Sequence, residues 1–344
     1  MKCALMEKPG LIVYEDRPVP AVGGDEVLVR IEHIGICGSD VHYFQKGRIG
    51  DFVVERPIVL GHESAGCVVE VGASVRGLAA GDRVALEPGR ACGVCSYCKS
   101  GRYNLCPSVV FMATPPYDGA FVEYVAYPAH LAFKLPEGVS TLEGSLIEPL
   151  AVGIHAANQG RARLGLSAAV LGAGCIGLVT VMALRSMGVT EIYATDTIRA
   201  RRLKAEELGA RRAFDPAVDN VPAAIADATG GEGVDIVLET AGSPAATGQT
   251  VELVRRGGVI VLVGMAPEGR MQLDFGKLIA KEASIKTVFR YRNIYPTAIR
   301  AVEGGLIPLA KIATDHFSFS EIPEAISHCI NDKESVIKAV IDMP

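Results

Sequence analysis

The feature that most limits the possible fold is a glycine-rich turn, GAGCIG, at residues 172–177. It follows an apolar, strand-like run, AAVL, and leads into a helix-like run, LVTVMALRSMG. In such a turn Gly172 permits the tight bend, Gly174 lets a pyrophosphate approach the backbone, and Gly177 lets the helix pack closely on its strand. Free amides at the helix N-terminus then face the phosphates. The pattern therefore predicts a dinucleotide-binding unit.

An acidic residue, Asp196, closes the next strand-like run, EIYATD. An acid at this place accepts hydrogen bonds from ribose hydroxyls and repels a 2′-phosphate, so NAD is favoured over NADP. Asp196 could also cap the helix expected from Arg199, and Arg199, Arg201 and Arg202 could tolerate the extra phosphate. We expect Arg201 to lie along the adenosine ribose. The predicted coenzyme-binding residues are Gly172, Gly174, Ile176, Gly177, Asp196, Arg201, Val263 and Gly264.

The order of strand-like and helix-like segments predicts two domains. Residues 1–150 contain short β-like runs broken by Gly, Pro and Asp, which indicates a mostly antiparallel unit. Residues 151–289 alternate apolar strands with amphipathic helices, which predicts an α/β unit whose parallel sheet is covered on both faces. Because residues 290–344 are too few to stand alone, we expect them to fold back onto the N-terminal unit. The expected helices cover 175–187, 199–208, 245–255, 293–303 and 321–330.

Four cysteines lie close together as C-x2-C-x2-C-x7-C within a glycine-rich loop: Cys92, Cys95, Cys98 and Cys106. Four such thiolates can close a tetrahedron around Zn²⁺ with no open position, which is typical of a structural site. Four unrelated thiols at this density are a much weaker explanation, and a reducing compartment disfavours disulfides. We predict a structural zinc that holds a protruding lobe, at a subunit contact.

Composition limits the partners of the chain. The formal net charge is -5 and no long run of Lys or Arg occurs, which argues against nucleic acid or anionic membrane as a partner. The N-terminus carries charges and prolines before any apolar segment of signal length, and no apolar run approaches the ~18 residues that cross a bilayer. We therefore expect a cytoplasmic protein. Its 9 cysteines are then better explained as thiols or metal ligands than as a disulfide framework.

A second group of metal-ligating side chains lies in GICGSDVH and GHESAG, which contain Cys37, His62 and Glu63. Cysteine and histidine are good zinc ligands, and a third, carboxylate ligand would leave one position open, as catalytic zinc requires. A single histidine in a β-rich unit is more often structural. Here a Cys and a His each lie between glycines, beside a second zinc motif and a nucleotide motif, which favours a catalytic metal site.

These motifs, with GRYNLCPS, FMATPPYDGAF, LIEPLAVGIHA and VFRYRN, resemble those of the zinc-dependent medium-chain dehydrogenases. Within that family they are similar to the polyol branch of sorbitol and xylitol dehydrogenases, and the resemblance runs through nearly the whole chain. It implies a GroES-like catalytic domain of residues 1–150, completed by 290–344, and a Rossmann NAD-binding domain of residues 151–289. The active site is then expected in the cleft between them. Relatives form dimers and tetramers, and by resemblance we favour a homotetramer.

By this resemblance Cys37, His62 and Glu63 bind the catalytic zinc beside a water, and Glu148 lies behind them or alternates with that water. Adjacent residues on an extended strand point to opposite faces, so His62 and Glu63 reach one metal only if the chain bends, which Gly61 permits. If the chain is extended there, Glu148 becomes the third ligand. The alcohol-dehydrogenase branch has a cysteine where Glu148 stands, which points away from simple alcohols.

The same segment supplies a predicted path for the proton. Ser39 lies two residues after Cys37 and is placed to accept a proton from the zinc-bound oxygen. By resemblance the proton passes through the nicotinamide ribose to His42, which exchanges with solvent. Asp40 is expected to orient His62. The alternatives are that Ser39 caps a helix starting at Asp40 and that His42 is an ordinary surface histidine.

A polyol has hydroxyls along its length, so its site needs several placed polar groups. Arg290 follows the apolar run TVF, where a charge is costly without a partner such as Glu148. Aromatic residues are more often core, which weakens the assignment of Phe111 and Tyr291. The candidate substrate-binding residues are Tyr43, Phe111, Thr114, Glu148, Arg290 and Tyr291.

The function that we expect is NAD-dependent oxidation of a polyol, either xylitol to xylulose or sorbitol to fructose. A second hypothesis keeps the fold and changes the substrate to galactitol, butanediol, threonine, a sugar acid or a simple alcohol. A third is a zinc-stabilised nucleotide-binding protein without turnover. The joint presence of Cys37, His62, Ser39 and His42 argues against the third, because a protein kept only for its fold needs no proton relay.

Overall fold

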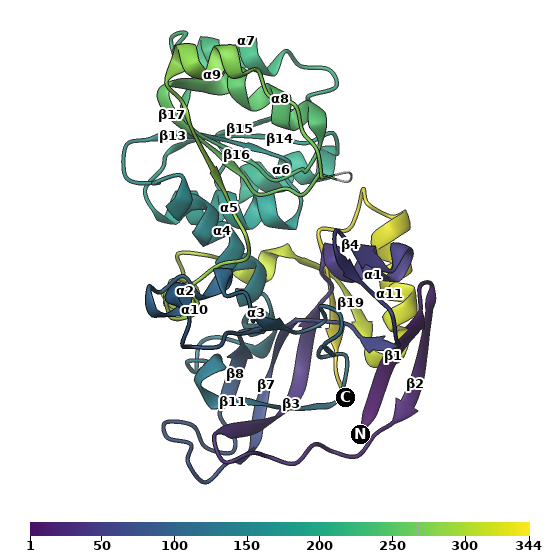
Figure 1. Cartoon of the computed structure of the whole chain (residues 1–344). Coiled ribbons are helices and arrows are strands. Elements are labelled where there is room, and N and C mark those ends of the chain that lie inside the picture. Colours follow the sequence, from purple (N-terminus) through teal and green to yellow (C-terminus); the bar gives the residue numbers. More distant parts are fainter. Residues whose placement is uncertain (267–268) are drawn as a thin grey trace. The chain divides into compact units, whose positions relative to one another are not determined.

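Short strands separated by Gly and Pro make up most of the first unit of the computed structural model, which describes residues 1–266 and 269–344. This first unit consists of Met1–Glu148 and Tyr295–Pro344. The second unit consists of Pro149–Ile294. The chain therefore leaves the first unit once and returns to it near its C-terminus (Figure 1).

A seven-stranded sheet is the frame of the first unit. Its strands follow the order β12-β8-β7-β3-β20-β19, and β11 also pairs with β3. The C-terminal segment supplies two of these strands, since β20 pairs antiparallel with β3 and places Ile341 opposite Ile34. The bounds are β3 (Glu26–Gly35), β7 (Glu63–Val71), β8 (Arg83–Leu86), β11 (Tyr124–Pro128), β12 (Ala132–Lys134), β19 (Ala313–Ser318) and β20 (Lys338–Asp342).

Smaller elements surround this sheet. One three-stranded sheet consists of β1 (Lys2–Lys8), β2 (Leu11–Asp16) and β6 (Ile58–Val59). The short pairs are β4 (Arg48–Ile49) with β5 (Phe52–Val53) and β9 (Gly89–Arg90) with β10 (Val110–Phe111). The helices are α1 (Gly38–Lys46), α2 (Ser96–Lys99), α3 (Thr141–Ser145), α10 (Tyr295–Glu303) and α11 (Ile322–Asn331), with 3₁₀ turns at Tyr103–Leu105, Ala129–Leu131, Leu309–Ile312 and Phe319–Glu321.

The core of the first unit comes from the inward-facing side chains of these strands. Ile31 and Ile34 of β3 and Leu86 of β8 are fully buried, as is Phe121 in the segment before β11. The apolar residues of α11 complete the same cluster, with Ile322 and Ile326 fully buried. The sheet that carries Cys37 and His62 at its strand ends is therefore rigidly packed.

A parallel sheet of six strands forms the centre of the second unit. Its strands are β13 (Ser167–Leu171), β14 (Glu191–Thr195), β15 (Arg212–Phe214), β16 (Val234–Glu239), β17 (Val254–Leu262) and β18 (Ser284–Thr287), in the order β15-β14-β13-β16-β17-β18. Every neighbouring pair is parallel. The order reverses between β13 and β16, which is the topological switch point where doubly wound sheets bind a dinucleotide.

Helices cover both faces of this parallel sheet. In Figure 1 α5 and α6 lie on one side of it, and α7, α8 and α9 lie on the other. The apolar sequence of α5 is explained by its burial, since its residues 177–184 are all buried. The bounds are α4 (Ile147–Gln159), α5 (Cys175–Ser186), α6 (Arg199–Glu207), α7 (Val221–Ala228), α8 (Pro244–Leu253) and α9 (Phe275–Lys281).

The predicted α/β class, with a mostly antiparallel unit and a doubly wound parallel unit, is confirmed. Each of the five expected helices is present, with ends that differ from expectation by no more than about two residues. The helix α1 is different, because it begins at Gly38 rather than at Asp40. No helix in the described residues has the length and hydropathy needed to span a membrane.

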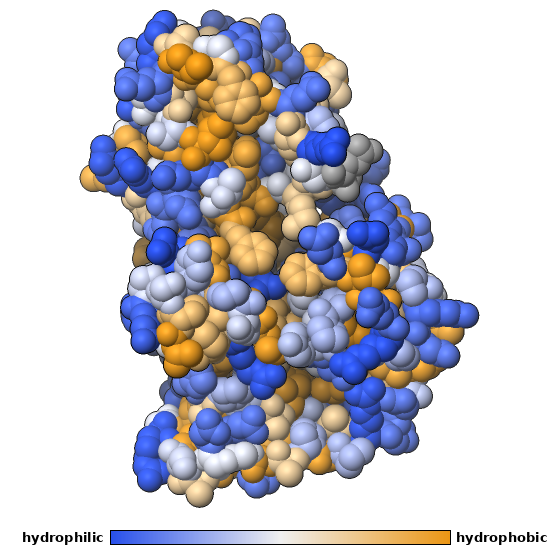
Figure 2. Space-filling model, viewed as in Figure 1, coloured by the Kyte–Doolittle hydropathy of each residue, from blue (hydrophilic) through white to orange (hydrophobic). Residues whose placement is uncertain are grey.

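Apolar side chains are exposed at one edge of the second unit. Phe275 and Ile279 of α9 are 65% and 79% exposed, and Phe289, just after the edge strand β18, is 45% exposed. Figure 2 shows hydrophobic side chains gathered in the upper part of the view, where α9 and this end of the sheet lie. Such a patch beside an open strand edge is a candidate protein contact.

Candidate active site

Cys37 lies at the junction between β3 and α1. The strand ends at Gly35, and Cys37 is the N-cap of α1, with φ -88° and ψ 154°. The N-cap position fixes the Cys37 side chain where the strand turns into the helix. The alternative in which Ser39 caps a helix starting at Asp40 is therefore wrong, because the cap position belongs to Cys37. Local structure thus brings this sulfur within 4.8 Å of ligand atoms of His62 and Glu63.

The carboxylate of Asp40 joins the two segments that carry Cys37 and His62. It accepts hydrogen bonds from the backbone amide of Cys37 (2.9 Å) and from that of Gly61 (2.9 Å). Burial raises the pKa of Asp40, whereas His62 and the two amides act in the opposite direction. The distance from Asp40 Oδ1 to His62 Nδ1 is 3.8 Å, too long for a hydrogen bond. Asp40 therefore holds the backbone beside His62. We had expected it to orient the His62 ring, but it makes no direct hydrogen bond to that ring.

His62 follows a bend that only glycine makes easily. Gly61 has φ +86°, and a Cβ there would lie 2.7 Å from the ring of Phe121. The imidazole of His62 is buried, and its ring centre lies 5.6 Å from that of Phe111. Burial lowers the pKa of His62, but the negative charges of Cys37, Asp40 and Glu148 outweigh it and raise that pKa to about 10. Anionic groups therefore converge on this imidazole, and the site attracts a cation.

Glu63 begins β7 and is 1% exposed. Because His62 lies before the strand and Gly61 bends the chain, both side chains reach the same point. Ligand atoms of Cys37, His62 and Glu63 all lie within 4.8 Å of one another. Both oxygens of Glu63 also accept hydrogen bonds from Lys338 Nζ, at 2.8 Å and 2.7 Å.

Glu148 is the second residue of α4 and is 6% exposed. Its charge raises the pKa of His62, so it lies close to the same site. Within the described residues it does not belong to the group whose ligand atoms lie within 4.8 Å, which contains only Cys37, His62 and Glu63. The geometry therefore favours Glu63 over Glu148 as the carboxylate nearest to a metal ion.

The donor set of this group fits zinc. Thiolate sulfur, imidazole nitrogen and carboxylate oxygen are the three ligand types that zinc takes from proteins. His62 Nδ1 has no hydrogen-bond partner among the described residues, and His62 and Glu63 are both buried. Three protein ligands are the number found in catalytic zinc sites, which keep a fourth position for water or substrate.

Ser39 and His42 lie on α1, three positions apart, and so face the same side of the helix. Ser39 is half-buried and His42 is exposed. Desolvation and the positive charges of Lys46 and Lys333 lower the pKa of His42, which keeps this imidazole neutral near neutral pH.

The candidate substrate residues fall in both units. Tyr43 and Phe111 are buried in the first unit, where Phe111 contacts the His62 ring, and Thr114 is half-buried. Arg290 and Tyr291 belong to the second unit. Arg290 has φ 56° and its guanidinium lies 4.8 Å from the centre of the Phe289 ring. The predicted pairing of Arg290 with Glu148 stays a prediction.

The glycine-rich turn has the geometry that its sequence predicts. Gly172 has φ +100° and lies directly after β13, and Gly174 is the N-cap of α5. A Cβ on Gly177 would collide with the carbonyl oxygen of Gly172, so only glycine allows the helix to pack this closely. Ile176 is the second residue of α5 and is half-buried. The free amides of this helix end lie at the carboxyl edge of the sheet, as in helix N-termini that bind phosphate groups.

Asp196 serves both sides of the adjoining turn. Its carboxylate accepts hydrogen bonds from the amides of Ala173 (2.9 Å) and Ile198 (2.9 Å). Arg202 donates to the carbonyl of Asp196 and forms an ion pair with Asp215 at 3.0 Å, so its charge is already paired within the protein. Arg201 lies over the turn, with one guanidinium nitrogen 3.8 Å from where a Cβ of Gly174 would be.

A buried acid, Glu239, joins two loops at the same edge of the sheet. One of its carboxylate oxygens accepts from the amides of Ala241 (3.0 Å) and Gly242 (2.7 Å). Its backbone carbonyl accepts from the amides of Val263 (2.8 Å) and Gly264 (2.9 Å). Burial raises the pKa of Glu239, against the opposing effect of these amides. Val263 and Gly264 are thus fixed beside the glycine-rich turn.

The four cysteines of the lobe form the second group of metal-ligand atoms, all within 4.8 Å of one another. Cys95 is the N-cap of α2, and its Sγ lies 3.5 Å from that of Cys98. Hydrogen bonds from the amides of Val94 and Cys95 lower the pKa of Cys92 to about 6. Four thiols with no other donor fit a closed, structural zinc site.

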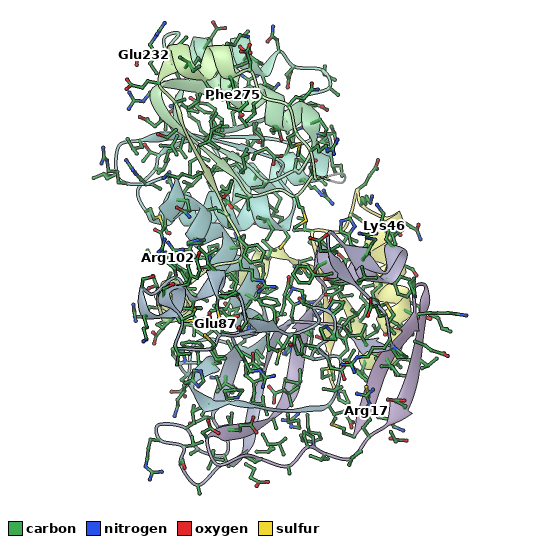
Figure 3. All side chains as sticks on the ribbon, in the orientation of Figure 1. Arg17, Lys46, Glu87, Arg102, Glu232 and Phe275 are labelled. Carbon is green, nitrogen blue, oxygen red and sulfur yellow. The ribbon has the colours of Figure 1, made fainter. Side chains whose placement is uncertain are left out.

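A buried acid, Glu87, ties this lobe to the main sheet. The hydroxyl of Tyr103, in the lobe, donates to Glu87 Oε1 at 2.7 Å. Figure 3 labels Glu87 at the base of the lobe and Arg102 within it. Burial raises the pKa of Glu87 to about 6, although the Tyr103 hydrogen bond acts in the opposite direction.

One cavity in the second unit, of about 520 Å³, is not at the coenzyme edge. It is lined by residues at the amino ends of β16 and β17, such as Gly233, Leu253 and Arg255. The glycine-rich turn, Asp196 and Glu239 all lie at the carboxyl ends of their strands. The cavity is therefore on the opposite edge from the predicted coenzyme site.

Lys338 and Glu239 were not among the residues predicted from the sequence. Each is a charge within or directly after an apolar run, VIKAVIDM and VDIVLET, the same signal that singled out Arg290. Applying that rule to every apolar run would have found both of them.

Comparisons with known proteins agree with these two units. Residues 23–137 match the family model described as "Alcohol dehydrogenase GroES-like domain", and residues 175–304 match the model described as "Zinc-binding dehydrogenase". The sorbitol dehydrogenase of Bacillus subtilis is 40% identical over 341 residues, which cover 99% of this chain and 97% of that protein.

Two solved structures show the same fold. An Escherichia coli oxidoreductase/dehydrogenase of unknown specificity is 42% identical, with a TM-score of 0.96 over 100% of this chain and 99% of the other. The 2R,3R-butanediol dehydrogenase of Bacillus subtilis is 32% identical, with a TM-score of 0.91 over 99% of each chain.

Proposed function

Because the chain belongs to the zinc-dependent medium-chain dehydrogenases, in their polyol branch, we propose that it oxidises a secondary hydroxyl of a polyol with hydride transfer to NAD⁺. The substrate pairs that we propose are xylitol with D-xylulose and sorbitol with D-fructose. The observation that carries the proposal is the convergence of Cys37, His62 and Glu63 within 4.8 Å, in a chain 40% identical to a sorbitol dehydrogenase.

In this proposal Cys37, His62 and Glu63 hold the catalytic zinc, and Glu148 lies behind them. When bound, zinc supplies the Lewis acidity that lowers the pKa of a substrate hydroxyl. Asp40 keeps the segments of Cys37 and His62 together through two backbone amides. Cys92, Cys95, Cys98 and Cys106 hold a second, structural zinc.

The proton of the substrate hydroxyl leaves along α1. Ser39 Oγ accepts it while its own hydroxyl proton is passed on, and the neutral imidazole of His42 takes up the relayed proton and releases it to solvent. Two observations support these roles: the residues share one side of the helix, and the lowered pKa of His42 leaves its ring neutral and able to accept a proton.

The second unit is proposed to bind NAD, which accepts the hydride when bound. Gly172, Gly174, Ile176 and Gly177 hold the pyrophosphate, Val263 and Gly264 the nicotinamide side, and Asp196 and Arg201 the adenosine ribose. In domain terms, the first unit, expected as residues 1–150 with 290–344, is proposed as the catalytic domain and the second unit, expected as 151–289, as the coenzyme domain; the two compact units divide at Glu148–Pro149 and Ile294–Tyr295. Tyr43, Phe111, Thr114, Glu148, Arg290 and Tyr291 are proposed to bind the polyol.

For assembly we propose a cytoplasmic homotetramer. Within the described residues β18 pairs only with β17, so its outer edge is open. The exposed Phe275, labelled in Figure 3, and Ile279 lie on the helix that precedes this strand. Sedimentation should give about four times the chain mass of 36.3 kDa, and a monomer would contradict the proposal.

One assay panel tests the proposed reaction. Formation of reduced nicotinamide is followed with xylitol, sorbitol, galactitol, threonine, butanediol and ethanol, each with NAD and then with NADP. We expect turnover with xylitol or sorbitol and NAD. Activity on ethanol without activity on polyols would contradict the proposal.

The second candidate keeps the fold and changes the substrate to galactitol, butanediol, threonine or a sugar acid. It is favoured by the similarity to the butanediol dehydrogenase, at 32% identity over 99% of this chain. Turnover that is fastest with one of these substrates would support it. Absence of reduced nicotinamide formation with every substrate would support a nucleotide-binding protein without catalysis.

A further inference from the structure

Lys338 has an unusual environment for a lysine. It is the first residue of β20 and is 4% exposed, and it is the one buried Lys or Arg in the part of the chain that the structure describes. A lysine is rarely buried unless its charge is paired. Its position in the centre of the first unit therefore needs an explanation.

The ammonium of Lys338 contacts both segments that carry the proposed zinc ligands. Its Nζ donates to the carbonyl of Ile36 at 2.9 Å and to the two carboxylate oxygens of Glu63 at 2.8 Å and 2.7 Å. Ile36 directly precedes Cys37, and Glu63 directly follows His62. One cation thus joins the two ligand-bearing segments.

The sheet places the lysine where it can do this. The strands β7, β3 and β20 are consecutive neighbours, and the amide of Ile36 donates to the carbonyl of Ala339 at 2.9 Å. Gly35 of β3 lies opposite Glu63 of β7, and any Cβ on Gly35 would collide with Glu63 Oε2. The absence of a side chain at Gly35 therefore leaves the space in which the Glu63 carboxylate meets the lysine of β20.

We propose that Lys338 is a positioning residue of the zinc site, which fixes the Glu63 carboxylate and the Cys37 and His62 segments relative to one another. The proposal rests on the proposed function, since it assumes that these three residues hold the metal. A ligating carboxylate is commonly hydrogen-bonded by an outer partner, and the loss of such partners weakens metal binding by about 10–100-fold. Lys338 is that outer partner for Glu63.

The competing explanation is that the ion pair only stabilises the sheet. Both explanations predict that loss of the lysine lowers the melting temperature. Only the proposed role also predicts a change in metal affinity at this site that depends on Glu63. A double-mutant comparison between positions 338 and 63 separates them.

The experiment measures Zn²⁺ affinity by chelator competition and the visible absorption of the Co²⁺-substituted protein, with zinc kept in the four-cysteine lobe. For Lys338→Met we expect about 10–100-fold weaker Zn²⁺ binding and an altered Co²⁺ spectrum, with partial recovery in Lys338→Arg. The double variant Lys338→Met with Glu63→Gln should bind Zn²⁺ no more weakly than Glu63→Gln alone.

Lys281 provides a matched control. Its Nζ also donates to three oxygens, the carbonyls of Val251 (2.7 Å), Glu252 (3.1 Å) and Val254 (2.7 Å), but in the second unit. Lys281→Met should lower the melting temperature and leave the Zn²⁺ affinity and the Co²⁺ spectrum unchanged. A change in metal affinity in this control would show that general destabilisation explains the effect, and would overturn the proposal.

Two further results would overturn it. One is Zn²⁺ affinity within about twofold of wild type in Lys338→Met, because the expected loss is about 10–100-fold. The other is a double variant that loses as much affinity again as the lysine variant alone, because Lys338 would then not act through Glu63. If Lys338→Met does not fold, the comparison of Glu63→Gln with the double variant decides, since the double variant leaves no buried charge unpaired.

Failure of the inference is distinguishable from failure of the proposed function. If the wild-type protein binds metal only in the lobe, the catalytic metal site itself is wrong. If the wild-type protein binds both ions and oxidises polyols but Lys338→Met binds Zn²⁺ normally, only the role of Lys338 is wrong.

Discussion

The four-cysteine lobe and the Cys37–His62–Glu63 group both gather zinc-ligand side chains within 4.8 Å, but they are built differently. The lobe takes all its ligands from residues 92–106 and lies at the surface, with Val94 70% exposed. The other group is assembled at the ends of β3 and β7, with His62 and Glu63 buried and Cys37 half-buried, and is supported by Asp40 and by Lys338 of the C-terminal strand. A local site can be recognised from spacing alone. An assembled site depends on contacts between distant parts of the chain.

The comparison predicts that the two groups fail in different ways, and the largest expected effect is on catalysis. Cys37→Ala removes a ligand of the proposed Lewis acid, which contributes several kcal/mol to the transition state, so kcat/KM should fall by about 10³-fold. Steady-state kinetics with xylitol or sorbitol checks this. Undiminished turnover in Cys37→Ala would show that this cysteine is not part of the active site.

Loss of a lobe cysteine should instead affect stability. Cys95→Ser removes a zinc ligand but keeps a residue that can cap α2, and we expect the opening free energy of residues 92–106 to fall by about 3 kcal/mol or more through loss of the metal. Amide hydrogen exchange measures this locally. The kcat per bound catalytic zinc should stay near wild type, and a large fall in kcat would mean that the lobe takes part in catalysis.

Asp40→Asn tests how far the assembled site depends on its support. An asparagine amide cannot accept hydrogen bonds from both backbone amides, Cys37 and Gly61, so one of them is left unsatisfied. We expect about 10–100-fold weaker zinc binding at Cys37 and His62. Asp82→Asn is the control, because Asp82 holds the amide of Ala79 and the side chain of Lys134. Equal metal affinities in the two variants would contradict the role of Asp40.

Glu87→Gln gives the smallest effect and a pH signature at the base of the lobe. The folded protein raises the pKa of Glu87 from 4.5 to about 6, so the folded state loses stability as pH rises through that window, by up to about 2 kcal/mol. Denaturant unfolding at pH 4.5 to 7 should show this dependence in the wild type and less of it in Glu87→Gln. Tyr103→Phe keeps the acid and removes its hydrogen bond, so the dependence should persist there.

Features that are local in sequence were predictable. The turn at Gly172, Gly174 and Gly177 has the predicted conformation because backbone sterics act over a few residues. The meeting of the four cysteine sulfur atoms was likewise predictable, because all four cysteines lie within residues 92–106. The parallel strands followed from continuous apolar runs between helices.

Features that depend on distant contacts were not predictable in the same way. The sequence left open whether Glu63 or Glu148 lies nearest to the metal, because that depends on the bend at Gly61 and on the meeting of β7 with β20. The role of Asp40 was expected at the His62 ring and was found at two backbone amides. Lys338 is separated from Glu63 by most of the chain, so no local pattern pairs them.

Anomalous X-ray scattering from crystals at the zinc absorption edge tests the central claim most directly. We predict two peaks for each chain, one among Cys92, Cys95, Cys98 and Cys106 and one in contact with Cys37, His62 and Glu63. A single peak in the lobe, in crystals of protein that oxidises polyols at full rate, would contradict the account.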